Sequence, residues 1–232
     1  MPKITLMPGG INASFPGGNA EPVKRGRVRG LTQGAARRNK AFLMSIDAAR
    51  FDPAETALNF TLTLRECPPT SKDWDRLKRS FVERLRRLGM LRCHHVTEWT
   101  RRGIPHLHGM AFFRDMPAPR VMRGAGAFRV VPTPAPVVQA WLAVAAPYGV
   151  ETWCQHVVAS SARVDVAWFK YMSKHASRGV GHYQREQALI PEGWQTTGRM
   201  WSALGDDWPL FREEHELPPW AFYALRRQLV AL

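Results

Sequence analysis

Two histidines separated by one residue are the clearest sign of chemistry in this sequence. Alternate side chains of a β-strand point to the same face, so His106 and His108 would project together. The preceding Arg101-Arg102-Gly103 is typical of a three-residue hairpin loop. Pairing across that loop places Glu98 opposite His106 and on the same face. Two imidazoles and a carboxylate suit a divalent cation, so we predict a metal site here.

The ligand types alone leave the identity of the metal open. Two histidines and a glutamate also bind zinc in hydrolases, although this sequence has no HExxH motif and its ligands lie on strands. The simpler alternative is a surface hairpin whose histidines and acid bind nothing. His94 and His95 are interpreted as ordinary sheet residues, and His94 lies too far along the strand to be a first-choice ligand.

A tyrosine and a lysine one helical turn apart form a second candidate group. On a helix near 165–177, apolar residues occupy one arc, and Tyr171, Lys174 and Arg178 occupy the opposite arc. A phenol has a pKa of about 10 and is a weak nucleophile unless a cation stabilises the phenolate. A nearby ammonium group and a metal would both help. The alternative is an amphipathic surface tyrosine.

The surrounding pattern predicts elements that would position these groups. Residues 58–65 alternate between apolar and polar, as a half-buried strand does. Thr70 or Ser71 starts a helix with an apolar stripe from Trp74 to Leu88, and Gly89 ends it. The further expected elements are strands near 91–100, 105–113 and 153–159, and helices near 136–146 and 165–177. This order predicts an α+β protein with the ferredoxin-like βαββαβ split fold, an antiparallel sheet with helices on one face.

Charge and composition indicate a polyanionic partner. The 232 residues carry 33 Lys and Arg against 19 Asp and Glu, a net charge of +14. Residues 1–45 are rich in Gly, Pro and basic side chains, and we expect a disordered, DNA-contacting arm. Residues 46–182 would form the main domain, with 183–232 as an extension that ends in a helix near 218–229. Three unclustered cysteines and the lack of a membrane span or signal peptide predict a soluble, cytoplasmic protein.

With these features the chain resembles the HUH endonucleases, the nickases that initiate rolling-circle replication and conjugative transfer. It looks most like the small plasmid and phage replication initiators, and like a one-tyrosine enzyme, because His175 stands where some members carry a second tyrosine. Three motifs carry the likeness in the family's order, and a fourth segment is similar to a Gly-Arg-x-Trp-Gly segment late in some phage initiators, with Ser in place of the last Gly. They are Phe60-Thr61-Leu62-Thr63-Leu64, His106-Leu107-His108-Gly109, Tyr171-Met172-Ser173-Lys174 and Gly198-Arg199-Met200-Trp201-Ser202.

The resemblance implies a mechanism and its residues. Mg²⁺ or Mn²⁺ would be bound by His106, His108 and the nearby acid Glu98, and would polarise a phosphate of single-stranded DNA at an origin hairpin. Tyr171 would attack that phosphate, and Lys174 would neutralise it or position the tyrosine. Host helicase and polymerase are the further partners implied. The expected DNA contacts are Lys24, Arg25, Arg27, Arg29, Thr61, Thr63, Arg101, Arg102 and Arg178.

Three other readings of the chain stay open. A mobilisation relaxase usually has its tyrosine near the N-terminus, whereas Tyr171 follows the histidines here, and a transposase fits the basic arm less well. A non-catalytic nucleic-acid-binding module would show aromatic stacking residues on its exposed strands instead of His106 and His108. A zinc hydrolase gives no reason for the Tyr-x-x-Lys segment.

Overall fold

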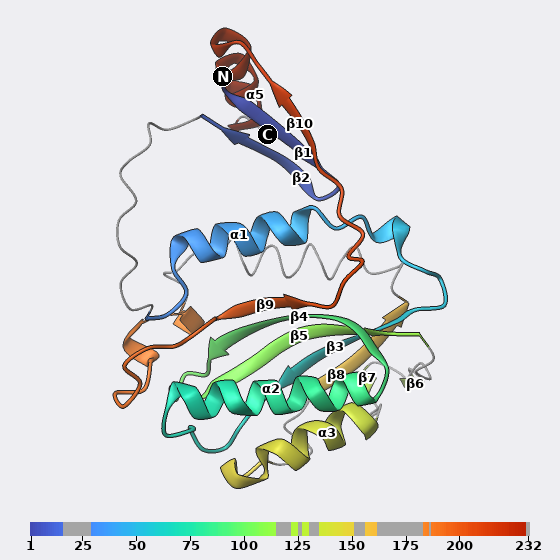
Figure 1. Cartoon of the computed structure of the whole chain (residues 1–232), viewed down its shortest axis with the longest axis vertical. Coiled ribbons are helices and arrows are strands. Elements are labelled where there is room, and N and C mark those ends of the chain that lie inside the picture. The colour runs from blue at the N-terminus through green and yellow to red at the C-terminus, as the bar shows by residue number, and fades with distance from the viewer. Residues whose placement is uncertain are drawn as a thin grey trace.

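The computed structural model describes residues 1–15, 29–114, 122–124, 127–129, 135–150, 156–161, 183–185 and 187–230 (Figure 1). The strands are β1 (Lys3–Met7), β2 (Gly10–Ser14), β3 (Thr56–Leu62), β4 (Met90–Trp99), β5 (Pro105–Phe113), β6 (Met122–Gly124), β7 (Ala127–Arg129), β8 (His156–Ser161), β9 (Trp201–Leu204) and β10 (Glu213–Glu216). The helices are α1 (Gln33–Met44), α2 (Ser71–Arg87), α3 (Ala135–Ala145) and α5 (Pro219–Val230). Short 3₁₀ turns are η1 (Ala48–Arg50), η2 (Ala146–Tyr148), η4 (Tyr183–Arg185) and η5 (Gln187–Leu189).

A five-stranded antiparallel sheet forms the centre of the protein, with the strand order β8-β3-β5-β4-β9. Along the chain, four of these strands and two helices follow as β3-α2-β4-β5-α3-β8. Both helices lie on the same face of the sheet (Figure 1). The α+β, ferredoxin-like split fold is therefore confirmed.

The core under α2 follows from the alternation in β3. Leu58, Phe60 and Leu62 are buried on one face of the strand, and they pack in one cluster with Trp74 and Phe81 of α2. Burial of these large apolar side chains is the main force that holds helix and sheet together.

Both ends of α2 lie where the sequence predicts them. The hydroxyl of Thr70 accepts a hydrogen bond from the backbone N–H of Asp73 and caps the first turn. Gly89 follows the helix with φ +85°, a conformation that glycine adopts without strain. The expected apolar stripe is one residue too long, because Leu88 is the C-cap and stays exposed.

The opposite face of the sheet is covered by α1, so residues 33–44 of the expected disordered arm form a helix, while residues 16–28 of that arm lie outside the described part of the chain. Thr32 caps α1, and Ala36, Asn39 and Leu43 form its buried face. The Nε2–H of His94 in β4 donates to Oδ1 of Asn39 at 2.7 Å. This face holds an alanine and an asparagine beside one leucine, so the hydrophobic periodicity of the segment is weak. The Gly-, Pro- and Arg-rich composition of residues 1–45 therefore indicated disorder in place of a helix.

The two ends of the chain form a second, smaller sheet with the order β10-β1-β2. β1 and β2 make a hairpin through a turn at Pro8 and Gly9, and β10 pairs with the other edge of β1. The expected last helix is present as α5. Residues 201–204 do more than pack on the main domain, since β9 is an edge strand of the central sheet.

The late Gly-Arg-x-Trp segment has a structural place beside α2. Gly198 has φ +65°, and a Cβ added there would lie 2.6 Å from Oδ2 of Asp75. Lys78, which is buried, pairs with Asp75 at 2.7 Å and donates to the backbone oxygen of Arg199 at 3.2 Å. The segment thereby fixes the start of β9 against α2.

Candidate metal centre

The β4–β5 hairpin has the register that the sequence predicts. Glu98 pairs with His106, and Val96 pairs with His108. The three-residue loop is closed by a hydrogen bond from the N–H of Thr100 to the oxygen of Ile104, and Gly103 takes the left-handed conformation at φ +74°. Both histidines and the acid consequently lie on the face that α1 covers, opposite α2 and α3.

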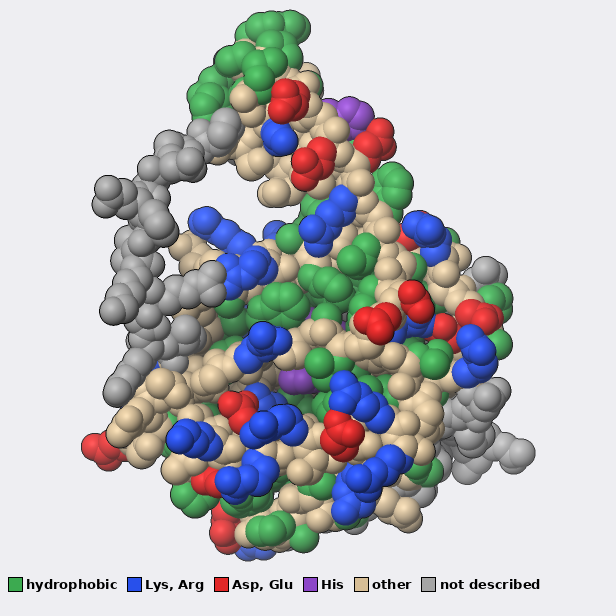
Figure 2. All heavy atoms as spheres, in the orientation of Figure 1, with side chains coloured by type: hydrophobic (Ala, Val, Ile, Leu, Met, Phe, Trp, Pro, Cys, Tyr) green, Lys and Arg blue, Asp and Glu red, His purple; other side chains and the backbone are tan. Residues whose placement is uncertain are grey.

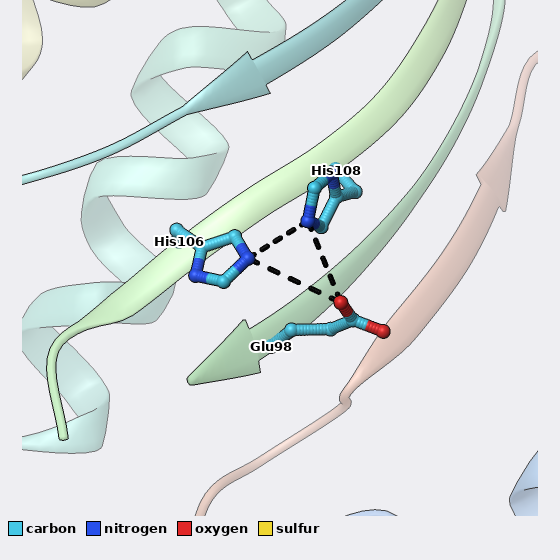
Figure 3. Close-up of side chains that lie close together, drawn as sticks. All are labelled: Glu98, His106 and His108. Atoms are coloured by element: carbon cyan, nitrogen blue, oxygen red, sulfur yellow. Dashed lines mark hydrogen bonds and ion pairs between the residues drawn. The ribbon is translucent and has the colours of Figure 1, made fainter. Parts of the chain in front are cut away.

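The three side chains converge on one point (Figure 3). The Nε2 atoms of His106 and His108 lie 2.8 Å apart, and Oε2 of Glu98 lies 4.0 Å and 3.4 Å from them respectively. A divalent cation with bonds of about 2.1 Å and ligands at right angles needs adjacent donor atoms about 3 Å apart. We call these residues the Glu98–His106–His108 cluster, and its spacing fits one such cation with positions left for other ligands.

Burial prepares the histidines for this role. Desolvation, with a smaller contribution from His108, lowers the pKa of His106 to about 3 against the opposing effect of Glu98. His106 is therefore neutral at physiological pH and has a lone pair to offer. The Nδ1 atom of His106 is buried, and it has no hydrogen-bond partner among the described residues. His94 and His95 are also buried, and their pKa values fall to about 3.

Two residues predicted to contact DNA have internal partners, Thr61 at this site and Thr63 toward α3 on the opposite side of the sheet. The hydroxyl of Thr61 lies 2.8 Å from Nδ1 of His108. Second-shell hydrogen bonds of this kind orient metal-binding histidines. The backbone oxygen of Thr63 accepts a hydrogen bond from the indole of Trp141 at 3.2 Å.

Within the described ranges, Arg185 is a neighbour of the cluster that the sequence did not predict. Its Nη2 lies 2.9 Å and its Nε 3.3 Å from Oε1 of Glu98, and both side chains are 2 % exposed. No periodic pattern or motif pointed to this contact, because 87 residues separate the partners.

Basic side chains gather next to the hairpin loop. Arg29, Arg101 and Arg102 line a pocket of about 690 Å³, whose opposite wall is residues 188–192. Each of the three arginines is exposed. Six further predicted site residues lie outside the described part of the chain: Lys24, Arg25, Arg27, Tyr171, Lys174 and Arg178. No helix within the described ranges has both the length and the apolar character needed to cross a bilayer.

Comparison with known proteins gives clear relatives. The chain is 42% identical over 220 residues to the replication-associated protein G2P of Pseudomonas phage Pf3, covering 94% of this chain and 73% of that one. It is 38% and 40% identical to proteins of Xylella fastidiosa strains 9a5c and Temecula1, whose names give replication as an inferred role. These matches cover 98% and 92% of this chain, and 77% and 75% of the relatives. No family model and no solved structure matches the chain.

Proposed function

Because this chain belongs to the family of replication proteins that includes G2P of Pseudomonas phage Pf3, we propose that it is a HUH endonuclease that initiates rolling-circle replication. Its substrate is single-stranded DNA at the hairpin of a plasmid or phage origin, and host helicase and polymerase act after it in the cytoplasm. The observation that carries the proposal is the buried Glu98–His106–His108 cluster on the central sheet.

The reaction is a transesterification, in which one phosphodiester bond is exchanged for another. The phenolic oxygen of Tyr171 attacks the scissile phosphorus, the bond to the 3′-oxygen breaks, and a 5′-phosphotyrosine and a free 3′-OH result. His106, His108 and Glu98 would hold Mg²⁺ or Mn²⁺, which would supply charge that polarises the phosphate. Lys174 neutralises the phosphate or positions the tyrosine. Because the new bond is again a phosphodiester, a later 3′-OH can reverse the step and rejoin the strand.

The basic groove at the hairpin loop is suited to the DNA backbone. Arg101 and Arg102 follow Glu98 by three and four residues, and Arg29 lines the same pocket. Further Lys and Arg side chains lie over α1 and α2 on the face shown in Figure 2, mixed with acids on α2. We assign the phosphate contacts to the hairpin loop and to the basic run 24–29, with Arg178, Thr61 and Thr63 as further DNA contacts.

The order of motifs favours an initiator over a relaxase of the same superfamily, because Tyr171 follows the histidines. A transposase of that superfamily shares the order but fits the basic arm and the C-terminal extension less well. A non-catalytic nucleic-acid-binding module is the alternative of a different class. Its sheet would present aromatic side chains for stacking, whereas this face presents three potential metal ligands.

A covalent-adduct assay tests the proposal. The full chain is incubated with a pool of single-stranded oligonucleotides and Mn²⁺, and SDS-resistant protein–DNA adducts are counted by gel. We expect an adduct that excess EDTA abolishes and that is absent from His106→Ala and His108→Ala. Tight DNA binding without any adduct would instead support the non-catalytic module. Full nicking in EDTA would contradict the metal assignment.

A further inference from the structure

We propose that Arg185 is the positioning residue of the metal centre: it holds Glu98 so that only one carboxylate oxygen faces the histidines. This inference rests on the proposed function, because it assumes that the Glu98–His106–His108 cluster binds a cation. It adds a residue from outside the motifs, in η4, to a centre that otherwise comes from the β4–β5 hairpin.

The contacts divide the carboxylate of Glu98 between two neighbours. Oε1 accepts from Nη2 of Arg185 at 2.9 Å and from Nε at 3.3 Å, so the guanidinium grips it with two donors. Oε2 lies 3.4 Å from Nε2 of His108. Two donors of one rigid, planar guanidinium on the same oxygen fix the place of Oε1. The bond to Arg185 therefore aims Oε2 at the imidazoles.

Because Glu98 is buried, holding its carboxylate in this orientation requires a neighbouring positive charge. Glu98 and Arg185 are each only 2 % exposed, and an isolated buried carboxylate is strongly unfavourable. Arg185 supplies the opposite charge beside the carboxylate of Glu98 and fixes its orientation.

The same contact influences the chemistry of the loaded centre. With Oε1 held by Arg185, Glu98 supplies one ligand atom, and coordination positions remain for water and a phosphate oxygen. The positive charge of the guanidinium offsets the negative charge of the carboxylate next to the site. A carboxylate without this partner could turn both oxygens toward a cation and would leave fewer positions for other ligands.

The test compares two buried arginines of the same protein. Arg92 also pairs with a buried acid, Glu55, and it lies on β4, the strand that carries Glu98. Mn²⁺ affinity is measured by electron paramagnetic resonance on the full chain of the wild type, R185A, R185K and R92A. We expect R185A to weaken Mn²⁺ binding by about 10- to 100-fold, with R185K between R185A and the wild type. The Mn²⁺ affinity of R92A should stay within about threefold of the wild-type value, which is less than the usual effect of losing a second-shell partner.

Unchanged or tighter Mn²⁺ binding in R185A would overturn the inference, and so would an equal loss in R92A. If R185A does not fold, R185K is the deciding variant. Wild-type Mn²⁺ affinity in R185K would contradict the positioning role of the guanidinium. A wild-type protein that binds no Mn²⁺ would instead contradict the proposed function.

A double-mutant cycle separates positioning from a general electrostatic effect. The cycle uses Ni²⁺, which imidazoles bind more tightly than Mn²⁺, so that binding stays measurable in E98Q. R185A should weaken Ni²⁺ binding in the wild-type background and have little effect in E98Q. An equal effect in both backgrounds would show that Arg185 acts without Glu98.

Discussion

The hydroxyl of Thr61 and Nδ1 of His108 lie 2.8 Å apart, across the directly paired positions of β3 and β5. If Nδ1–H of His108 donates to this hydroxyl, Nε2 of His108 carries a lone pair. In the metal-free protein that lone pair accepts the proton of the neighbouring Nε2 of His106 at 2.8 Å. A cation at the cluster would displace this proton, so Thr61 selects the tautomer that can bind metal.

The first prediction concerns this hydroxyl. Thr61→Val keeps the shape and removes the hydrogen bond, so we expect Mn²⁺ affinity to fall by about 10- to 100-fold with little loss of fold. Thr61→Ser restores the hydroxyl and should restore most of the affinity. Isothermal titration calorimetry measures both. A valine variant that binds Mn²⁺ as the wild type does would show that Thr61 leaves the tautomer unaffected.

Much of the candidate site could be predicted because its signals are local. The alternation of β3 and the Arg-Arg-Gly loop lie within a few residues of the pairs they determine, and the loop length fixes which residue faces which. Glu98 opposite His106 follows from these two facts alone.

The contacts that the sequence could not predict join distant segments. Arg185 reaches Glu98 across 87 residues, and β10 (Glu213–Glu216) reads as a charged loop until it pairs with β1 near the other end of the chain. β10 buries little of its surface, so its sequence shows no alternation of apolar and polar residues. Such pairings depend on tertiary packing that no short window contains.

Gly109 gives a prediction about packing next to the metal ligands. A Cβ at this position would lie 2.3 Å from Cζ of Phe60 and 2.7 Å from the backbone oxygen of His94. Gly109→Ala must displace a buried ring or a strand, so we expect a loss of at least about 2 kcal/mol in the free energy of unfolding. Gly34→Ala in α1 is the control, because its Cβ meets nothing closer than 3.5 Å. Urea unfolding measures both, and an equally stable Gly109→Ala would contradict the packing argument.

Buried histidines should make the stability of the protein sensitive to acid. Burial lowers the pKa of His94 from 6.5 to about 3, so between these values the unfolded chain binds a proton that the folded chain excludes. Stability is therefore complete above about pH 6.5 and falls as pH decreases, by about 1.4 kcal/mol per pH unit for each such histidine. His94→Gln should reduce this slope by about that amount in urea titrations from pH 6.5 to 4.5. His215→Gln, at a side chain that is 43% exposed, should leave the slope as it is.

The hairpin arginines should bind phosphates without regard to sequence. Changing Arg101 and Arg102 to Gln removes two charges, so log Kd against log salt should flatten by about 1.4 for single-stranded DNA. Affinity should fall for every oligonucleotide alike, as measured by fluorescence anisotropy. Arg86→Gln with Arg87→Gln removes the same charge from the exposed end of α2 and should leave the slope unchanged. A loss confined to one DNA sequence would indicate base contacts instead.

The last prediction is that Tyr171 is the only covalent nucleophile. Tyr171→Phe removes one oxygen and changes packing little, so the adduct and the nick should disappear together while Mn²⁺ and DNA binding persist. Lys174→Ala should slow the reaction without abolishing it, since a positioned charge assists the transfer but does not carry the new bond.

Two other tyrosines lie in places unsuited to this role. Tyr148 follows α3, on the face of the sheet opposite the Glu98–His106–His108 cluster, and Tyr223 belongs to α5, which packs with the smaller sheet at the chain ends. Peptide mapping of the adduct by mass spectrometry decides between them and Tyr171. A nucleotide on Tyr148, Tyr183 or Tyr223 would move the active site. Nicking by the wild type without an adduct would instead indicate direct attack of water on the phosphate. No phosphotyrosine would then form, and the energy of the broken bond would not be available to rejoin the strand.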